Sequence, residues 1–129
     1  MNLLITGGSG YVGTRLIYKL VEKNINIHNY DISLFGDEHL PIKENFYYHK
    51  KDLRDTKSFR DIISEHKIDI VLHLACISND PTFELNKKIS KEINYDAFEP
   101  IVKISKELGV KKFIYASTCS VYGVSEKKD

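Results

Sequence analysis

Short apolar runs alternate along this chain with longer stretches in which apolar residues recur at helical spacing. The short runs end at glycine or polar residues, as strands buried in a parallel sheet do, and predict strands at 3–5, 25–30, 46–48, 69–73 and 112–117. The stretches between them predict helices over 11–23, 56–66 and 85–108. Strands that alternate with helices imply a parallel sheet with right-handed crossovers.

The expected fold is therefore a doubly wound α/β domain with strand order 3-2-1-4-5. In this order the carboxyl ends of the first, second, fourth and fifth strands share one edge, and ligands bind there, where the strand order reverses. The residues at this edge are Thr6, Asp31, residues 73–75 and residues 116–118.

Residue types at the helix ends support this assignment. Asp55 can cap the second helix, and Gly109 is a natural cap at the end of the third. Pro100 lies inside the third helical pattern and should kink or split it. The buried face of the first helix is expected to comprise Val12, Leu16, Ile17, Leu20 and Val21.

Residues 6–13 read Thr-Gly-Gly-Ser-Gly-Tyr-Val-Gly and join the first strand to the first helix. Glycine has no Cβ to block a phosphate, and a helix N-terminus presents unpaired N–H groups and the positive end of its dipole. We predict that Gly7, Gly10 and Gly13 hold the pyrophosphate of a dinucleotide, with Gly13 letting the helix pack on the first strand. The alternative is a turn with a structural role only.

Asp31 ends the second strand, 18 residues after Gly13. A carboxylate at this place accepts hydrogen bonds from both ribose hydroxyls and repels a 2′-phosphate, which favours NAD over NADP. The alternative is an aspartate that only caps a turn.

Composition narrows the class of protein. A chain of 129 residues suits one domain, 1–129, and 19 basic against 18 acidic residues leave a net charge of +1. We therefore expect no nucleic-acid and no membrane partner. Cys76 and Cys119 show no metal-type spacing, so we predict no metal site, no disulfide scaffold and a cytoplasmic location. We expect both cysteines to act as small buried hydrophobes and not as a redox pair.

Taken together, these motifs resemble the extended branch of the short-chain dehydrogenase/reductase superfamily, and within it the NAD-dependent nucleotide-sugar epimerases and dehydratases. The glycines are spaced three and three, as in that branch. The matching residues are 6–13, Asp31, 52–55, 73–75, Asn94 and 116–123.

The resemblance implies roles in holding NAD. Asp52 would bind the adenine amino group with Leu53 packed on the ring, and Asn94 would tether the long helix to the site. Turn capping by Asp52 and a solvent-facing Asn94 are the alternatives. The full set of cofactor-binding residues expected is Gly7, Gly10, Tyr11, Val12, Gly13, Asp31, Asp52, Leu53, Leu74, Ala75, Asn94, Ala116 and Ser117.

The resemblance also implies a catalytic and a substrate side. Thr118 would bind the sugar hydroxyl that is oxidised, and Ser78 and Asn79 are candidates for contact with the nucleotide-sugar substrate. His73 is expected to be a buried, hydrogen-bonded strand residue and not a base.

The family reaction needs a tyrosine base and a lysine four residues after it. No such pair follows Thr118, which lies 11 residues before the last residue of the sequence. The pattern occurs at Tyr47 and Lys51, in the predicted third strand, which we interpret as coincidence. We expect the chain to be the N-terminal part of a longer, homodimeric protein, with the fifth strand left as an uncovered edge.

Several functions stay open at this point. The leading hypothesis is a nucleotide-sugar epimerase, favoured over a dehydratase because Cys119 and Ser120 stand where dehydratases carry acidic residues. A non-catalytic dinucleotide-binding module is the second hypothesis. An NADP-linked sugar reductase is the third, and Asp31 argues against it.

Overall fold

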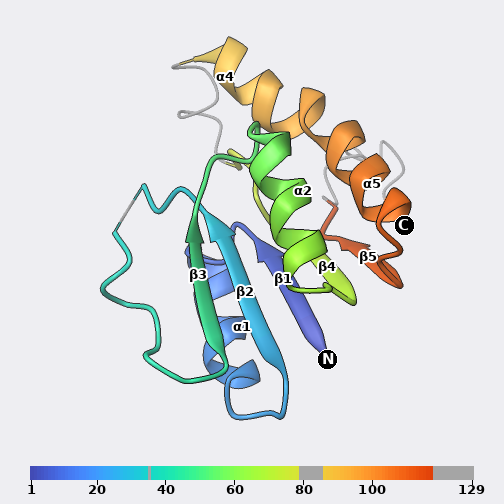
Figure 1. Cartoon of the computed structure of the whole chain (residues 1–129). Helices are drawn as coiled ribbons and strands as arrows, with labels where there is room; N and C mark the ends of the chain where they lie inside the picture. The colour runs from blue at the N-terminus through green and yellow to red at the C-terminus, as the bar shows by residue number, and fades with distance from the viewer. Residues whose placement is uncertain (35, 79–85, 118–129) are drawn as a thin grey trace, which may run out of the picture.

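The computed structural model describes residues 1–34, 36–78 and 86–117 (Figure 1). Its centre is a five-stranded sheet of order β3-β2-β1-β4-β5, in which every neighbouring pair is parallel. This confirms the predicted fold class and strand order. The strands are β1 (Asn2–Thr6), β2 (Asn26–Asp31), β3 (Phe46–Lys50), β4 (Ile70–His73) and β5 (Lys112–Tyr115).

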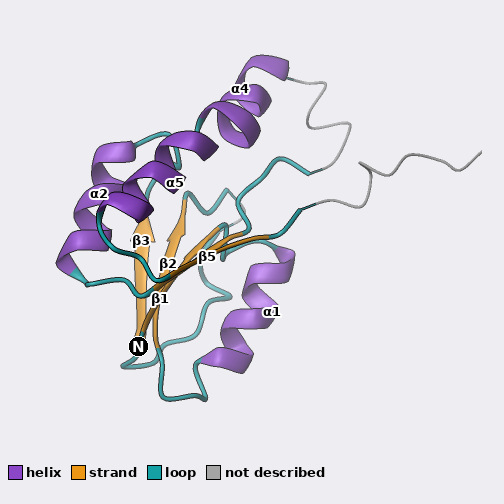
Figure 2. Cartoon of the chain, turned by 90° about the vertical axis from the view of Figure 1, so that its right-hand side faces the viewer, coloured by secondary structure: helices purple, strands orange, loops and turns teal. Residues whose placement is uncertain are grey.

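Helices cover both faces of the sheet (Figure 2). α1 (Tyr11–Leu20) lies on one face, and α2 (Thr56–Glu65) and α5 (Phe98–Glu107) lie on the other. One core cluster lies under α2 and α5 and includes Leu4, Phe59 and Ile101. A second lies under α1 and includes Ile5 and Ile17. None of the described helices has the length and apolar character needed to cross a bilayer.

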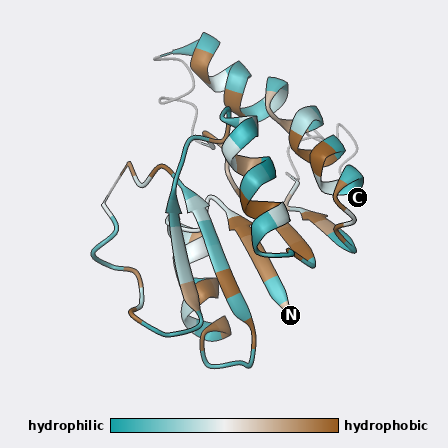
Figure 3. Cartoon of the chain, viewed as in Figure 1, coloured by the Kyte–Doolittle hydropathy of each residue, from teal (hydrophilic) through white to brown (hydrophobic). Residues whose placement is uncertain are grey.

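The central strands carry most of the apolar character of the sheet. Figure 3 shows β1 mostly in brown and the edge strand β3 mostly in teal. Leu4 and Ile5 of β1 have no exposed surface, whereas Tyr47 of β3 is 42% exposed. A strand with helices on both faces and strands on both sides must be apolar throughout, while an edge strand need not be.

The first helix differs from its predicted extent. α1 ends at Leu20, three residues before the predicted end, and Ile17 and Val21 are buried as expected. Val12 is 62% exposed, so its predicted place on the buried face is wrong. It lies in the first turn, beside glycines that have no side chains to bury it.

The predicted third helix is split into three parts: α4 (Lys87–Lys91), the π-helical η1 (Glu92–Asp96) and α5. The N–H of Ala97 bonds the carbonyl of Glu92, five residues back, at 2.9 Å. Pro100 is the third residue of α5; it has no N–H, and its ring clashes with a helical carbonyl four residues back, that of Asp96. The split predicted from Pro100 is thus confirmed, and it falls just before the proline.

The predicted helix caps are also confirmed. Asp55 is the N-cap of α2 and accepts a hydrogen bond from the Ser58 N–H at 3.0 Å. Gly109 has φ of +77° after α5, and its N–H bonds the Lys106 carbonyl. With the bond from the Val110 N–H to the Ser105 carbonyl, this forms a Schellman motif.

β5 forms one edge of the described sheet. It pairs with β4 and ends at Tyr115, two residues before the predicted end, although the Ala116 N–H still reaches the His73 carbonyl at 3.3 Å. Ile114 is 43% and Tyr115 is 52% exposed. The apolar surface of this strand is uncovered in the described part of the chain, as expected.

Candidate functional site

The glycine turn lies where β1, β2 and β4 end. Gly7 has φ of +74°, and a Cβ there would lie 2.5 Å from the backbone nitrogen of Ala75. A Cβ at Gly13 would lie 2.5 Å from the Cα of Gly8. Gly13 therefore lets α1 pack closely on the glycine turn. The predicted packing of the helix on the first strand is thereby corrected to packing on the turn that follows the strand.

The N-terminus of α1 is open to a ligand. Its N-cap, Gly10, has no side chain and provides no capping hydrogen bond. Tyr11 and Val12, in the first turn, are 86% and 62% exposed. Helix N–H groups without a cap, at the positive end of the dipole, form an anion site.

Asp31 connects two loops at this edge. Its Oδ2 accepts the Ser9 N–H at 3.0 Å, and its Oδ1 accepts the Ser33 N–H at 2.7 Å. The turn-capping alternative for Asp31 is therefore observed. A carboxylate has about four acceptor sites, so the half-buried side chain can also accept hydroxyl donors.

Under the turn lies a chain of hydrogen bonds that sequence reasoning missed. The Tyr48 hydroxyl donates to Ser33 Oγ at 2.6 Å, and Ser33 Oγ donates to Ser9 Oγ at 2.9 Å. The Asn29 amide donates to the same Ser9 oxygen at 3.0 Å. A side chain at Gly8 would overlap the Asn29 Oδ1. The available signal was an asparagine inside an apolar strand, which needs a buried partner.

His73 is a buried strand residue, as expected. It is 2% exposed, and its Nδ1 lies 2.6 Å from Thr6 Oγ1. Its ring stacks on Tyr115, with centroids 5.6 Å apart. Burial lowers the pKa of His73 to about 4, so the imidazole is neutral at pH 7.

The segment after β4 is held from two sides. The Leu74 N–H bonds the Thr6 carbonyl at 3.0 Å, which keeps residues 74 and 75 against Gly7. Asn94 of η1 accepts the Ile77 N–H at 2.8 Å and donates to the Ile77 carbonyl at 2.9 Å. The Asn94 side chain thereby ties the helical region to the segment that carries the predicted cofactor contacts.

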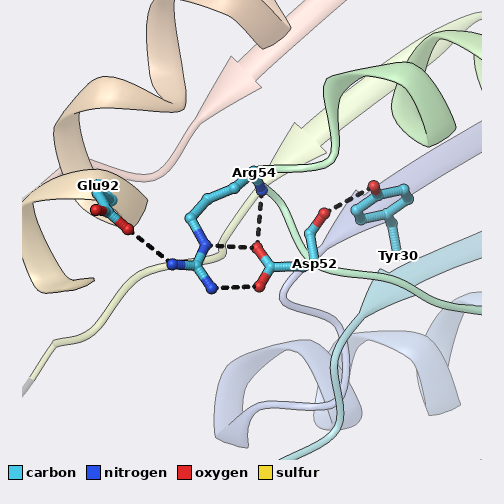
Figure 4. A network of polar contacts seen from close by, with 4 residues as sticks. All are labelled: Tyr30, Asp52, Arg54 and Glu92. Atoms are coloured by element: carbon cyan, nitrogen blue, oxygen red, sulfur yellow. Dashed lines mark hydrogen bonds and ion pairs between the residues drawn. The ribbon is translucent and has the colours of Figure 1, made fainter.

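Asp52 pairs with a residue that sequence reasoning did not place in the site. Arg54 binds both Asp52 oxygens, at 3.0 and 2.7 Å, and reaches Glu92 of η1 at 2.7 Å (Figure 4). Hydrogen bonds from Arg54 hold the pKa of Asp52 below its usual value. The Tyr30 hydroxyl donates to the Asp52 carbonyl at 2.9 Å. Leu53 is 4% exposed and belongs to the core.

The remaining predicted residues lie on the outside of the structure or beyond what it describes. Ser78, Ala116 and Ser117 are exposed. Cys76 is exposed, so its expected burial is wrong; it follows β4 where the chain leaves the sheet. The predictions for Asn79, Thr118 and Cys119 lie outside the described residues.

The fold and the site define a Rossmann-type dinucleotide-binding protein: a parallel sheet, a glycine turn that closes on itself, and an open helix N-terminus beside a carboxylate. Residues 3–129 match the NAD dependent epimerase/dehydratase family, and the chain belongs to that family. The cofactor of the family is NAD, which the glycine cradle and Asp31 fit.

Known relatives include dehydratases, epimerases and a dTDP-4-dehydro-6-deoxyglucose reductase of Escherichia coli, which is 33% identical over 131 residues and covers 96% of this chain and 41% of the relative. The chain is 32% identical over 130 residues to a dTDP-D-glucose 4,6-dehydratase of Mus musculus, covering 95% of this chain and 37% of the relative. It is 31% identical over 139 residues to a UDP-glucose 4-epimerase of Yersinia enterocolitica, covering 98% and 39%. The chain thus spans well under half the length of these relatives and matches their N-terminal, NAD-binding part.

Solved structures show the same fold. A UDP-glucose 4-epimerase of Thermotoga maritima with UDP-glucose superposes with a TM-score of 0.88 at 28% identity, covering 99% of this chain and 41% of that one. The Bordetella bronchiseptica enzyme WbmH in complex with NAD⁺ gives 0.83 at 25% identity, covering 96% and 41%.

Proposed function

We propose that this chain is the NAD-binding part of a nucleotide-sugar epimerase. The observation that carries the proposal is the uncapped N-terminus of α1 above a turn that only glycine can form, with Asp31 at the end of the neighbouring strand. Relatives that act on dTDP-D-glucose and UDP-glucose support a nucleotide sugar as the substrate. Cys119 and Ser120, where dehydratases carry acidic residues, favour epimerisation over dehydration.

Each predicted residue has a task in this proposal. The first N–H groups of α1 bind the pyrophosphate, and Asp31 accepts the ribose hydroxyls while still bonded to Ser9 and Ser33. Bound NAD supplies the oxidant for a sugar hydroxyl. The cofactor roles of Asp52, Leu53, Leu74, Ala75, Asn94, Ala116 and Ser117 are part of the proposal.

The substrate side is proposed from the family alone. Thr118 orients the sugar hydroxyl, and Ser78 and Asn79 contact the sugar. A homodimeric full-length protein and a cytoplasmic location also stay predictions.

A dinucleotide-binding module without turnover is the second candidate for this chain alone. The Tyr-Lys pattern at Tyr47 and Lys51 does not lie in the glycine site. Tyr47 is on the edge strand β3 and stacks on His28, with ring centroids 4.7 Å apart. This position supports our interpretation of the pattern as coincidence.

Calorimetric titration with NAD and with NADP tests the proposal. We expect NAD to bind at least about tenfold more tightly, a difference of about 1.4 kcal/mol. Absence of NAD binding, or tighter binding of NADP, would contradict it. The coding sequence that follows codon 129 separates the two candidates: a Tyr-x-x-x-Lys pattern there supports the epimerase, and a stop codon supports the module without turnover.

A further inference from the structure

Three histidines from three separate elements meet on the α2 side of the sheet. His28 is on β2, His49 is on β3 and His66 follows the last residue of α2. One ring nitrogen of each lies within 4.8 Å of the others. His28 is 2% exposed, while His49 and His66 are half-buried, so the cluster reaches from the core to the surface.

Strand register explains why two of them are neighbours. β2 and β3 pair His28 with Tyr47 and Tyr30 with His49, so the two histidines are diagonal on one face. Their nitrogens, His28 Nδ1 and His49 Nε2, are 3.1 Å apart.

The end of α2 brings the third ring over this pair. His66 is the C-cap of α2, and its ring centroid lies 4.5 Å from that of His28. Its backbone is fixed, because its carbonyl accepts a hydrogen bond from the Asn2 side chain at 2.7 Å. Any change in the position of the His66 ring must therefore come from rotation of its side chain.

Two of these imidazoles are held in the form that binds metals. Burial, with the nearby His66 and His49, lowers the pKa of His28 to about 4. Burial also lowers the pKa of His49, on which Glu65 and Lys51 act in opposite directions. A neutral imidazole has one ring nitrogen with a free lone pair, which is the form that ligates a metal.

We propose that His28, His49 and His66 form a binding site for a divalent transition metal of the zinc class. Zinc binds imidazole nitrogen at about 2.0–2.1 Å in tetrahedral geometry, which places neighbouring ligand nitrogens about 3.3 Å apart. The His28 and His49 nitrogens, 3.1 Å apart, are already close to this separation. Rotation of the His66 side chain brings the third nitrogen in.

The chemistry of the donors sets the metal class. Three imidazoles suit Zn²⁺, Ni²⁺ or Cu²⁺ and do not suit Mg²⁺ or Ca²⁺, which prefer oxygen ligands. One nitrogen of the His28–His49 bond carries the proton; metal binding moves that proton to the other nitrogen of the same ring, so neither ring changes charge. A bound water completes the fourth position.

Such a site would fasten the end of α2 to the edge strands β2 and β3. It is separate from the proposed phosphate cradle at the N-terminus of α1, a helix that packs on the opposite face of the sheet. The alternative is a stack of rings without metal, in which Tyr47 packs on His28 with an interplanar angle of 14°.

Calorimetric titration with Zn²⁺, after removal of bound metal by a chelator, tests the site. We expect one equivalent to bind to the wild-type chain, and at least about tenfold weaker binding to His49→Gln and to His66→Gln. His39→Gln is the matched control, because His39 is half-buried but lies outside the cluster. It should bind Zn²⁺ as the wild type does, and so should Cys76→Ser.

Absence of Zn²⁺ binding to the wild type, or equal binding by the cluster variants, would overturn the proposal. So would Zn²⁺ binding lost in Cys76→Ser. If a cluster variant does not fold, the imidazole NMR signals of the wild type test the proposal instead. Zn²⁺ should shift the signals of His28, His49 and His66 and leave that of His39 unchanged. NAD affinity, measured in the same samples, should not differ between wild type and the cluster variants.

Discussion

Asp31 Oδ2 accepts a hydrogen bond from the Ser9 N–H at 3.0 Å, so the carboxylate that ends β2 holds the glycine turn that follows β1. The side chain proposed to recognise the ribose is therefore also part of the support of the phosphate cradle. Its replacement should affect both selectivity and stability.

Asp31→Asn tests the first of these effects. The amide keeps one acceptor oxygen and nearly the same shape but loses the negative charge that disfavours a 2′-phosphate. We expect the preference for NAD over NADP to disappear. Parallel titrations with the two cofactors measure it. An unchanged NAD/NADP ratio would refute the ribose assignment.

Asp31→Ala removes both hydrogen bonds, to Ser9 and Ser33. Hydrogen bonds to a charged group contribute about 1.5–3 kcal/mol each, less where water can replace them. We expect the free energy of unfolding to fall by about 2 kcal/mol, measured by urea denaturation. A stability equal to that of Asp31→Asn would show that the charge, not the bonding, supports the turn.

Gly13→Ala should close the cradle. The added Cβ would lie 2.5 Å from the Gly8 Cα and 2.6 Å from its carbonyl oxygen, so α1 must move away from the turn. Overpacking of this kind costs about 1–3 kcal/mol. We expect at least about tenfold weaker NAD binding, measured by calorimetry.

Gly109→Ala is the matched control for that variant. Gly109 has φ of +77°, and a Cβ there would meet nothing within 4 Å. A left-handed alanine costs about 1–2 kcal/mol, so this variant should lose stability and keep its NAD affinity. Equal loss of affinity in both variants would mean that Gly13 acts through stability alone.

Much of this architecture could be predicted from local sequence signals. The glycine turn and the Asp55 cap each depend on a few adjacent residues whose preferences agree with the fold, and the strand order follows from the alternation of strands and helices. Pro100 predicted the split of the third helical pattern, but not the π-helical turn before it. That turn depends on how the chain relieves the clash upstream of the proline, which a pattern of apolar residues does not encode.

The parts that were missed depend on pairing between distant elements. Ser9, Ser33 and Tyr48 meet only because β1, β2 and β3 lie side by side in the sheet. The Arg54–Glu92 contact spans 38 residues. No spacing rule gives these contacts, because they require the register of the sheet and the position of η1.

Asn94→Ala should loosen the segment after β4. It removes both hydrogen bonds to Ile77, the acceptor at 2.8 Å and the donor at 2.9 Å. We expect faster hydrogen exchange of the Ile77 amide than in the wild type, with little change at amides of β1. Asn94→Asp keeps the acceptor for the Ile77 N–H and should give an intermediate rate. Identical exchange in all three proteins would show that the pair does not order this segment.

The buried His73 should make stability depend on pH. Its pKa is about 4 in the fold and about 6.5 in the unfolded chain, because burial disfavours the charged ring. Between these values the unfolded chain binds a proton that the folded chain does not. The free energy of unfolding is thus greatest above pH 6.5 and falls as the pH drops towards 4, by up to about 3 kcal/mol for this residue.

His73→Gln can still bond Thr6 and does not titrate, so urea denaturation between pH 4 and 7 should give a shallower slope of the free energy of unfolding against pH for the variant. The slope that remains belongs to His28 and His49 and, near pH 4, to the carboxylates of Asp52, Asp55, Asp69 and Glu99, whose pKa values are all lowered. Equal slopes for the variant and the wild type would mean that His73 can take up a proton without unfolding.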